Sequence, residues 1–339
     1  MIIAGLDIGG ANTDISIIEY NAKNEIIATI TDFKYIPMWK RDNKLIEGLH
    51  ELTGEYNIDY IGISMTAELV DSYETKKEGV LDVASKVMNT FDVPVYFLSK
   101  DGIVNYEFLK KNPLSVAAFN WIGTSYLVGK LSSKCIFMDM GSTTTDIIPI
   151  INKISVTRGK TDLDRLCTGE LVYTGILRSN VASIVDKVPY NNYVCRVASE
   201  LFATTADVHM VLGNITQSDY INDTVDGKGK YIIDCMRRIS RVVCADLDLL
   251  SKEDIITICE YIYEKQVLLV KEALEEVVNY TNIDSVVLTG LGKDIVCYEA
   301  AKLLDLNIIN MGDNFSKDEC TVAPAIGLVY MLYDYIIET

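Results

Sequence analysis

One eight-residue pattern occurs twice in this chain and restricts its possible folds more than any other feature. The first copy, residues 7–14, reads Asp-Ile-Gly-Gly-Ala-Asn-Thr-Asp, and the second, residues 139–146, reads Asp-Met-Gly-Ser-Thr-Thr-Thr-Asp. An apolar run precedes each copy and another follows it, which predicts a β-strand, a tight turn and a second strand. Because a whole unit recurs at the spacing of a domain, the sequence indicates two related domains.

The turn residues of both copies suit an anionic ligand. Glycine and asparagine tolerate the positive φ angles of tight turns, and successive backbone N–H groups form an anion-binding concavity. Carboxylates such as Asp7 and Asp14 flank the turn and would repel a bare phosphate, so we expect a divalent cation to bridge them. For a single copy, an ordinary hairpin with aspartates at its shoulders is the alternative.

The acidic composition restricts the partners further. The 339-residue chain has a formal net charge of −17, which argues against nucleic acid as a ligand. The eight cysteines lack zinc-type spacing and favour a reduced, cytoplasmic protein. The most apolar long run, residues 325–337, is too short to span a bilayer, so no membrane association is expected. The sequence leaves the formation of a homo-oligomer open.

Strands alternate with predicted helices along the chain, which indicates α/β domains. The predicted domains are residues 1–131 with 323–339, and residues 132–322. The second domain includes a helical insertion, with one helix predicted at 197–212.

Three cations lie near these predicted strands. Lys100 follows a strand, and strand carboxyl ends bind ligands in such folds. Arg158 and Lys160 follow the second copy of the pattern and are able to contact oxyanions. A plain solvated turn is the alternative for all three residues.

A third glycine-rich turn, Gly290-Leu-Gly292, follows the apolar run 285–288 and precedes a predicted helix. Turns of this type at a helix N-terminus suit phosphate or nucleotide binding. Turns of this type occur in most α/β folds. This turn therefore indicates phosphate binding only together with the two Asp-x-Gly turns.

The three turns in this order resemble the actin-like ATPase superfamily. The residues of both Asp-x-Gly turns, 7–14 and 139–146, resemble those of its hydantoinase/oxoprolinase branch. The segments 66–71, 165–175 and 202–207 resemble an archaeal group of that branch linked to methanofuran metabolism. The resemblance extends over essentially the whole chain. It implies an α/β protein with a two-domain actin-like (ribonuclease H-like) fold and a cleft between the domains.

The resemblance also implies a reaction. Members of the archaeal group join γ-glutamyltyramine to an aminomethylfuran methyl diphosphate, which forms an aryl ether and releases diphosphate. This chain would then be a transferase of methanofuran biosynthesis with small-molecule substrates. Its Mg²⁺ would bind at Asp7 and Asp139, directly or through water, and either Asp14 or Asp146 would take the phenol proton.

The implied phosphate-binding residues come from all three turns and from the nearby cations. They are Gly9, Gly10, Ala11, Asn12, Thr13, Gly141, Ser142, Thr143, Thr144, Lys100, Arg158, Lys160, Gly290 and Gly292.

Two other functions fit the same fold. The first is an ATP-dependent kinase or amide-ring hydrolase, and the second is a non-enzymatic actin-like protein that binds nucleotide. Lys293 and Asp294 follow the third turn, which departs from a typical nucleoside site. That departure favours phosphate binding over adenosine binding at this turn.

Overall fold

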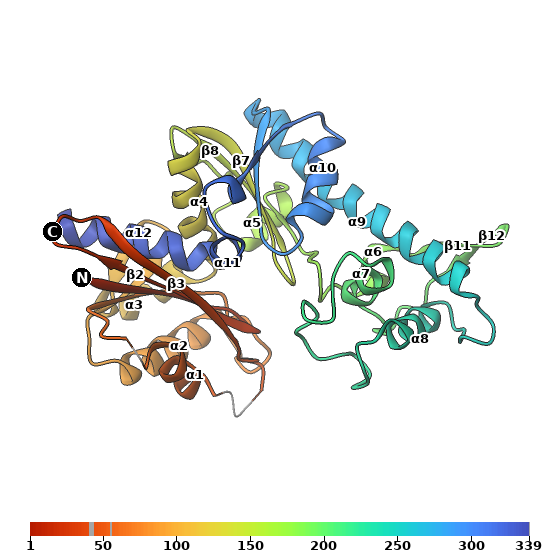
Figure 1. Ribbon diagram of the computed structural model, residues 1–339, viewed down its shortest axis with the longest axis horizontal. Helices are drawn as coiled ribbons and strands as arrows, with labels where there is room; N and C mark the ends of the chain where they lie inside the picture. Colours follow the sequence, from red (N-terminus) through yellow and green to blue (C-terminus); the bar gives the residue numbers. More distant parts are fainter. Residues whose placement is uncertain (41–43, 55, 339) are drawn as a thin grey trace. The chain divides into compact units, whose positions relative to one another are not determined.

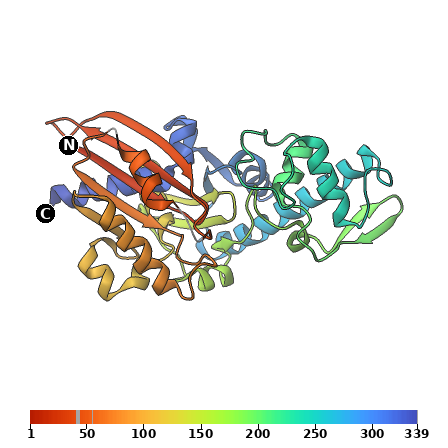
Figure 2. The same cartoon turned by 90° about the horizontal axis from the view of Figure 1, so that it is seen from below.

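The computed structural model describes residues 1–40, 44–54 and 56–338, and the chain divides into two compact units. The first unit comprises Met1–Ser133, Ile150–Ser155 and Met311–Thr339, and the second comprises Lys134–Pro149 and Val156–Asn310. Each unit contains its own β-sheet and helices (Figures 1 and 2). Of the predicted domain ranges, residues 41–43, 55 and 339 lie outside the described part.

The first unit is built on a six-stranded sheet with the order β3-β2-β1-β4-β5-β6. Its strands are β1 (Ile2–Ile8), β2 (Asn12–Tyr20), β3 (Ile26–Tyr35), β4 (Tyr60–Met65), β5 (Val95–Ser99) and β6 (Gly102–Asn105). β1, β4 and β5 run parallel. Their carboxyl ends therefore meet at one edge of the sheet, where Asp7 and Lys100 lie.

The first unit also contains the helices that cover this sheet and the short strand β9. They are α1 (Leu45–Thr53), α2 (Lys76–Thr90), α3 (Tyr106–Lys111), η1 (Pro113–Val116), α4 (Asn120–Leu131), β9 (Ile154–Ser155), η3 (Met311–Asp313), α11 (Lys317–Thr321) and α12 (Ala323–Glu338). The apolar α12 lies close against β1 because Gly5 has no side chain, and a Cβ there would overlap Ala325 O. A Cβ at Gly327 would likewise overlap Gly123 O of α4. Glycines thus allow the C-terminal helix to complete the first unit.

The sheet of the second unit has the order β10-β8-β7-β13-β14, and β9 pairs with β8 beside this path. Its strands are β7 (Lys134–Met140), β8 (Thr145–Ile151), β10 (Leu171–Val172), β13 (Ser285–Thr289) and β14 (Asn307–Asn310). β13 runs parallel to β7 and places Thr289 opposite Asp139. The third glycine-rich turn therefore begins beside the second Asp-x-Gly turn.

The rest of the second unit is mostly helical. It contains α5 (Asp162–Cys167), α6 (Val181–Ile184), β11 (Lys187–Tyr190), β12 (Tyr193–Arg196), α7 (Thr205–Leu212), α8 (Ile232–Val242), α9 (Lys252–Thr281), η2 (Lys293–Cys297) and α10 (Tyr298–Lys302). The predicted helix at 197–212 begins only at Thr205. At the start of the helix Thr204 N donates to Asp207 Oδ2 at 3.0 Å, and residue 204 forms a β-bridge with Asn180.

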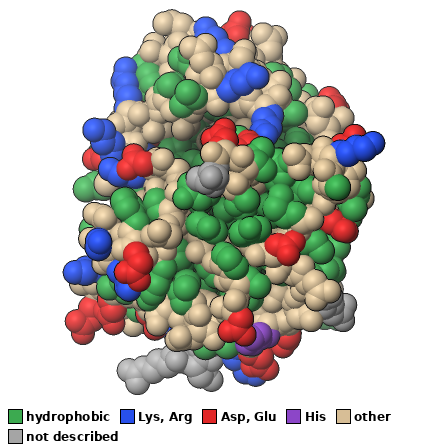
Figure 3. All heavy atoms as spheres, turned by 90° about the vertical axis from the view of Figure 1, so that its left-hand side faces the viewer, with side chains coloured by type: hydrophobic (Ala, Val, Ile, Leu, Met, Phe, Trp, Pro, Cys, Tyr) green, Lys and Arg blue, Asp and Glu red, His purple; other side chains and the backbone are tan. Residues whose placement is uncertain are grey.

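Apolar side chains gather on the face that Figure 3 shows. In the first unit, β3 forms the edge of the sheet and exposes Ile26, Ile27, Ile30 and Phe33. Exposed apolar edge strands are common association surfaces, and a homo-oligomer stays a prediction. Within the described ranges, no helix combines the length and hydropathy needed to cross a membrane.

Candidate phosphate-binding site

The first Asp-x-Gly turn joins β1 to β2, as the sequence predicted. Gly9 N donates to Asn12 O at 2.8 Å and closes the turn. The N–H groups of Gly10 and Ala11 donate no hydrogen bond to any described residue. They are thus available to an anion.

Asp7 and Asp14 pair directly across the hairpin, so their side chains project from one face of the sheet. Asp7 is buried, and its two carboxylate oxygens accept hydrogen bonds from Ser64 Oγ at 2.7 Å and Asn120 Nδ2 at 3.0 Å. These bonds fix the orientation of the carboxylate at the end of β1.

The oxygen donors around Asp7 fit Mg²⁺ chemically. Magnesium prefers hard oxygen ligands and is often held by one or two carboxylates together with substrate phosphates. The described residues contain no group of three or more His, Cys, Asp or Glu side chains that could bind a metal by themselves. A magnesium ion at Asp7 would share its coordination with the phosphates of a substrate.

The second Asp-x-Gly turn repeats this geometry between β7 and β8. Gly141 N donates to Thr144 O at 3.0 Å, which closes a turn of the same length as the first. Asp139 holds the position at the end of β7 that Asp7 holds in β1. The sequence repeat is therefore a repeat of local structure.

The third turn packs directly on the second. Gly290 has φ +82°, and a Cβ there would overlap the Oδ1 atom of Asp139 and lie 2.5 Å from Met140 O. Gly292 N donates to Met140 O at 3.0 Å. Glycine is thus required at residue 290 for both the backbone angle and the close approach.

Asp146 has a buried cation beside it. Arg165, only 3% exposed, donates from Nη2 to Asp146 Oδ1, and the same Nη2 donates to the backbone oxygen of Glu170 at 3.0 Å. Sequence reasoning did not identify this ion pair, because Arg165 stands in a run that reads as a solvated charged loop. The neighbouring residues, Leu166 to Glu170, gave no local signal that Arg165 is buried.

The predicted cationic loop at 158–160 holds a carboxylate of the protein itself. Glu170, fully buried, accepts hydrogen bonds from Arg158 N at 2.6 Å, Gly159 N at 2.7 Å and Tyr280 Oη at 2.5 Å. The Arg158 guanidinium lies 3.6 Å from the centre of the Tyr280 ring. Burial and then the hydrogen bond to Glu170 raise the pKa of Tyr280. Lys160 is exposed, and its backbone N donates to an Asp164 carboxylate oxygen at 3.2 Å.

Two further cations differ in their relation to the turns. Lys100 is exposed at the end of β5, with its Nζ 4.0 Å from an oxygen of Asp101. Arg178 ends the segment Thr174–Arg178, which we call the backing loop, and its backbone N donates to Ser142 O at 2.9 Å. The backbone of Arg178 therefore lies beside the second turn.

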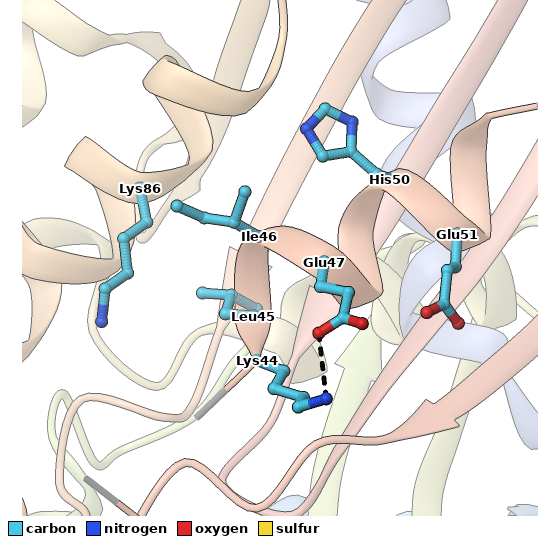
Figure 4. Close-up of a pocket in the computed structure, with 7 residues that line it drawn as sticks. All are labelled: Lys44, Leu45, Ile46, Glu47, His50, Glu51 and Lys86. Atoms are coloured by element: carbon cyan, nitrogen blue, oxygen red, sulfur yellow. Dashed lines mark ion pairs between the residues drawn. The ribbon is translucent and has the colours of Figure 1, made fainter. Parts of the chain in front are cut away.

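A separate hollow of 580 Å³ lies over α1 and α2 in the first unit (Figure 4). Its walls are mainly apolar, and none of the Asp-x-Gly residues lines it. The lining residues are Lys44, Leu45, Ile46, Glu47, His50, Glu51 and Lys86.

Sequence comparisons show which known proteins this chain resembles. The hydantoinase/oxoprolinase family profile matches residues 59–333. The chain is 40% identical over 334 residues to the (4-{4-[2-(gamma-L-glutamylamino)ethyl]phenoxymethyl}furan-2-yl)methanamine synthase of Methanocaldococcus jannaschii, covering 98% of each chain. A synthase of the same name from Methanococcus vannielii is 36% identical over 205 residues, which is 60% of this chain and 92% of that relative.

Solved structures resemble the fold at low sequence identity. A nucleotide-free acetone carboxylase has a TM-score of 0.58 at 10% identity, covering 96% of this chain and 70% of that chain. A putative N-acetylmannosamine kinase from Listeria monocytogenes has a TM-score of 0.50 at 12% identity, covering 99% and 100%. The predicted actin-like α/β fold is confirmed.

Proposed function

The chain belongs to the hydantoinase/oxoprolinase family, and from this premise we propose that it is the transferase that forms an aryl ether of methanofuran biosynthesis. The name of its relatives describes a furan methylene bonded to a phenol oxygen, with a γ-glutamyl group on the tyramine nitrogen. The two halves of that product correspond to γ-glutamyltyramine and an aminomethylfuran methyl diphosphate. The identity of 40% over 98% of both chains is the observation that carries this proposal.

The reaction breaks one C–O bond and forms another. The furan methylene loses diphosphate, which leaves with the bonding electron pair, and the phenol oxygen bonds to the same carbon. The phenol proton passes to a base. Because a furan ring stabilises positive charge on its methylene, the main demand on the protein is to stabilise the departing diphosphate, which is electrostatic work.

The turns supply groups for that work. The N–H groups of Gly10 and Ala11 have no other acceptor among the described residues, and the second turn repeats the same closed geometry. Asp7 and Asp139 are the proposed holders of Mg²⁺, which when bound would neutralise charge on the leaving diphosphate. Arg178 beside the second turn adds a cation in a chain whose net charge is −17.

Asp14 and Asp146 are the two proposed general bases. Arg165 donates to Asp146 Oδ1, which ties that carboxylate to a buried positive charge. One oxygen of Asp146 is thus already engaged by a guanidinium N–H group. Asp14→Asn and Asp146→Asn separate the two, because the variant that lacks the base should lose more of the rate of ether formation at neutral pH.

The reaction needs only small molecules and a metal ion, and we place it in the cytoplasm. All eight cysteines have free thiols, as expected in a reducing compartment. No nucleic acid or membrane takes part in the proposed chemistry.

Product analysis tests the proposal. The purified protein is incubated with Mg²⁺, γ-glutamyltyramine and the furan diphosphate, and mass spectrometry follows the ether. We expect the ether only when both substrates are present. A phosphorylated or ring-opened product that appears only with ATP would replace the transferase by the ATP-dependent alternative.

A further inference from the structure

The backing loop holds the second phosphate-binding turn in place. The backbone N–H groups of residues 176–178 donate to the carbonyls of Gly141 and Ser142 at 2.9 to 3.1 Å. Gly175 approaches so closely that a Cβ there would overlap Thr143 N. A shift of the backing loop must therefore move the turn and the backbone of Arg178 with it.

Gln266 of α9 in turn anchors the backing loop. Its side chain is fully buried, and its Nε2 donates to Thr174 Oγ1 at 3.0 Å and to Gly175 O at 2.9 Å. The backbone oxygen of Thr174 also accepts a hydrogen bond from Thr145 Oγ1 at 2.7 Å, directly after the second turn. One amide thus fixes the end of the backing loop nearest to β8.

A histidine completes the chain of hydrogen bonds. Because both hydrogens on Gln266 Nε2 are donated, its Oε1 is the acceptor for His209 Nε2, which lies 3.0 Å away. His209 Nε2 therefore carries the proton, and Nδ1 accepts from Asn214 Nδ2 at 3.1 Å. Burial lowers the pKa of His209 to about 4, so the ring is neutral near pH 7. Every donor in this chain points toward the backing loop.

These polar groups lie beside the apolar core of the helical region, where Val208 and Ile262 are buried. Burying an imidazole and an amide costs free energy unless each is hydrogen-bonded, and apolar residues of similar volume would pack as well. The hydrogen bonds of Gln266 Nε2 and Thr205 Oγ1 converge on Thr174 and Gly175. We propose that Gln266 and His209 are positioning residues that hold the second turn and Arg178 in register with the diphosphate.

This inference rests on the proposed function, and equilibrium binding of inorganic diphosphate with Mg²⁺ is its readout. Gln266→Leu and His209→Leu should weaken diphosphate binding and lower kcat on the order of tenfold to a hundredfold, since small misplacements of catalytic groups have effects of that size. The KM for γ-glutamyltyramine should stay unchanged. His209→Gln keeps a donor near the position of Nε2 and should restore most of the activity.

A matched control separates positioning from plain stability. Thr281→Val removes a side-chain hydrogen bond, Thr281 Oγ1 to Val277 O at 2.7 Å, elsewhere in α9. It should lower thermal stability without changing diphosphate binding or kcat. If a single leucine variant does not fold, the double variant His209→Leu/Gln266→Met removes both polar partners together and leaves fewer of them unsatisfied.

The outcomes are distinct. Folded Gln266→Leu or double-variant protein with wild-type diphosphate affinity and kcat overturns the positioning role. Wild-type protein that does not bind diphosphate with Mg²⁺ overturns the proposed function, and with it this inference. Weaker binding in the variants, with rescue by His209→Gln and no effect of Thr281→Val, supports it.

Discussion

Acidification should destabilise the second unit through one histidine. Burial lowers the pKa of His209 from 6.5 to about 4. Because the folded-state pKa lies below the unfolded-state value, the unfolded chain binds the extra proton first as the pH falls. The stability is therefore fully present above about pH 6.5 and is lost between pH 6.5 and 4. The linkage relation gives a loss of about 2 kcal/mol at pH 5 and about 3 kcal/mol at pH 4.

Urea unfolding at several pH values measures this effect. Both tryptophans, Trp39 and Trp121, lie in the first unit, so their fluorescence reports on that unit. Circular dichroism at 222 nm also detects the 30-residue α9 of the second unit. Carboxylates titrate in the same range, so the relevant quantity is the difference between the wild-type protein and His209→Gln. The exposed His50 supplies the control variant, His50→Gln.

The expected result is a dichroism midpoint that falls with pH more steeply in the wild-type protein than in His209→Gln. The tryptophan signal should show the same pH dependence in both proteins. Equal slopes in the dichroism signal would refute the reasoning, because they would mean that His209 is not buried as a neutral ring. A matching change in His50→Gln would also contradict it.

Four other substitutions, one of them with a control, test the site and the core. Asp7→Asn and Asp139→Asn should each lower turnover about 10²- to 10³-fold with the fold intact by circular dichroism; activity that persists in either variant or in EDTA contradicts the metal assignment. Gly290→Ala should reduce turnover strongly because the new Cβ overlaps a carboxylate oxygen, whereas Gly227→Ala, also at positive φ but in open space, should not. Arg238→Met leaves a fully buried carboxylate without its ion-pair partner and should cost about 3–5 kcal/mol in urea unfolding; a loss below 1 kcal/mol would contradict this.

The turns could be predicted because their information is local. Asp7 to Asp14 contains its own strand ends, glycines and carboxylates, and the second copy repeats that order. Hairpin geometry depends on a few neighbouring residues, so the predicted turns agree with the observed Gly9–Asn12 and Gly141–Thr144 closures. The third turn was predictable for the same reason.

The environment of the turns depends on distant residues and was not predictable. Arg165 pairs with Asp146 from 19 positions away, and Tyr280 reaches Glu170 from 110 positions away. A charged loop and a helical tyrosine have the same local pattern whether they are exposed or buried. Gln266 shows the same limit, because one polar residue in a long helix gives no sign of the loop that it contacts.

The stoichiometry of diphosphate release tests the central claim most directly. Ether and diphosphate are measured together in nucleotide-free buffer with Mg²⁺, with and without added ATP. A leaving group already attached to the furan supplies the driving force, so the account predicts one diphosphate for each ether, no stimulation by ATP, and competitive inhibition by diphosphate against the furan substrate. Ether formation that strictly requires ATP, with ADP or AMP appearing in step, would contradict it.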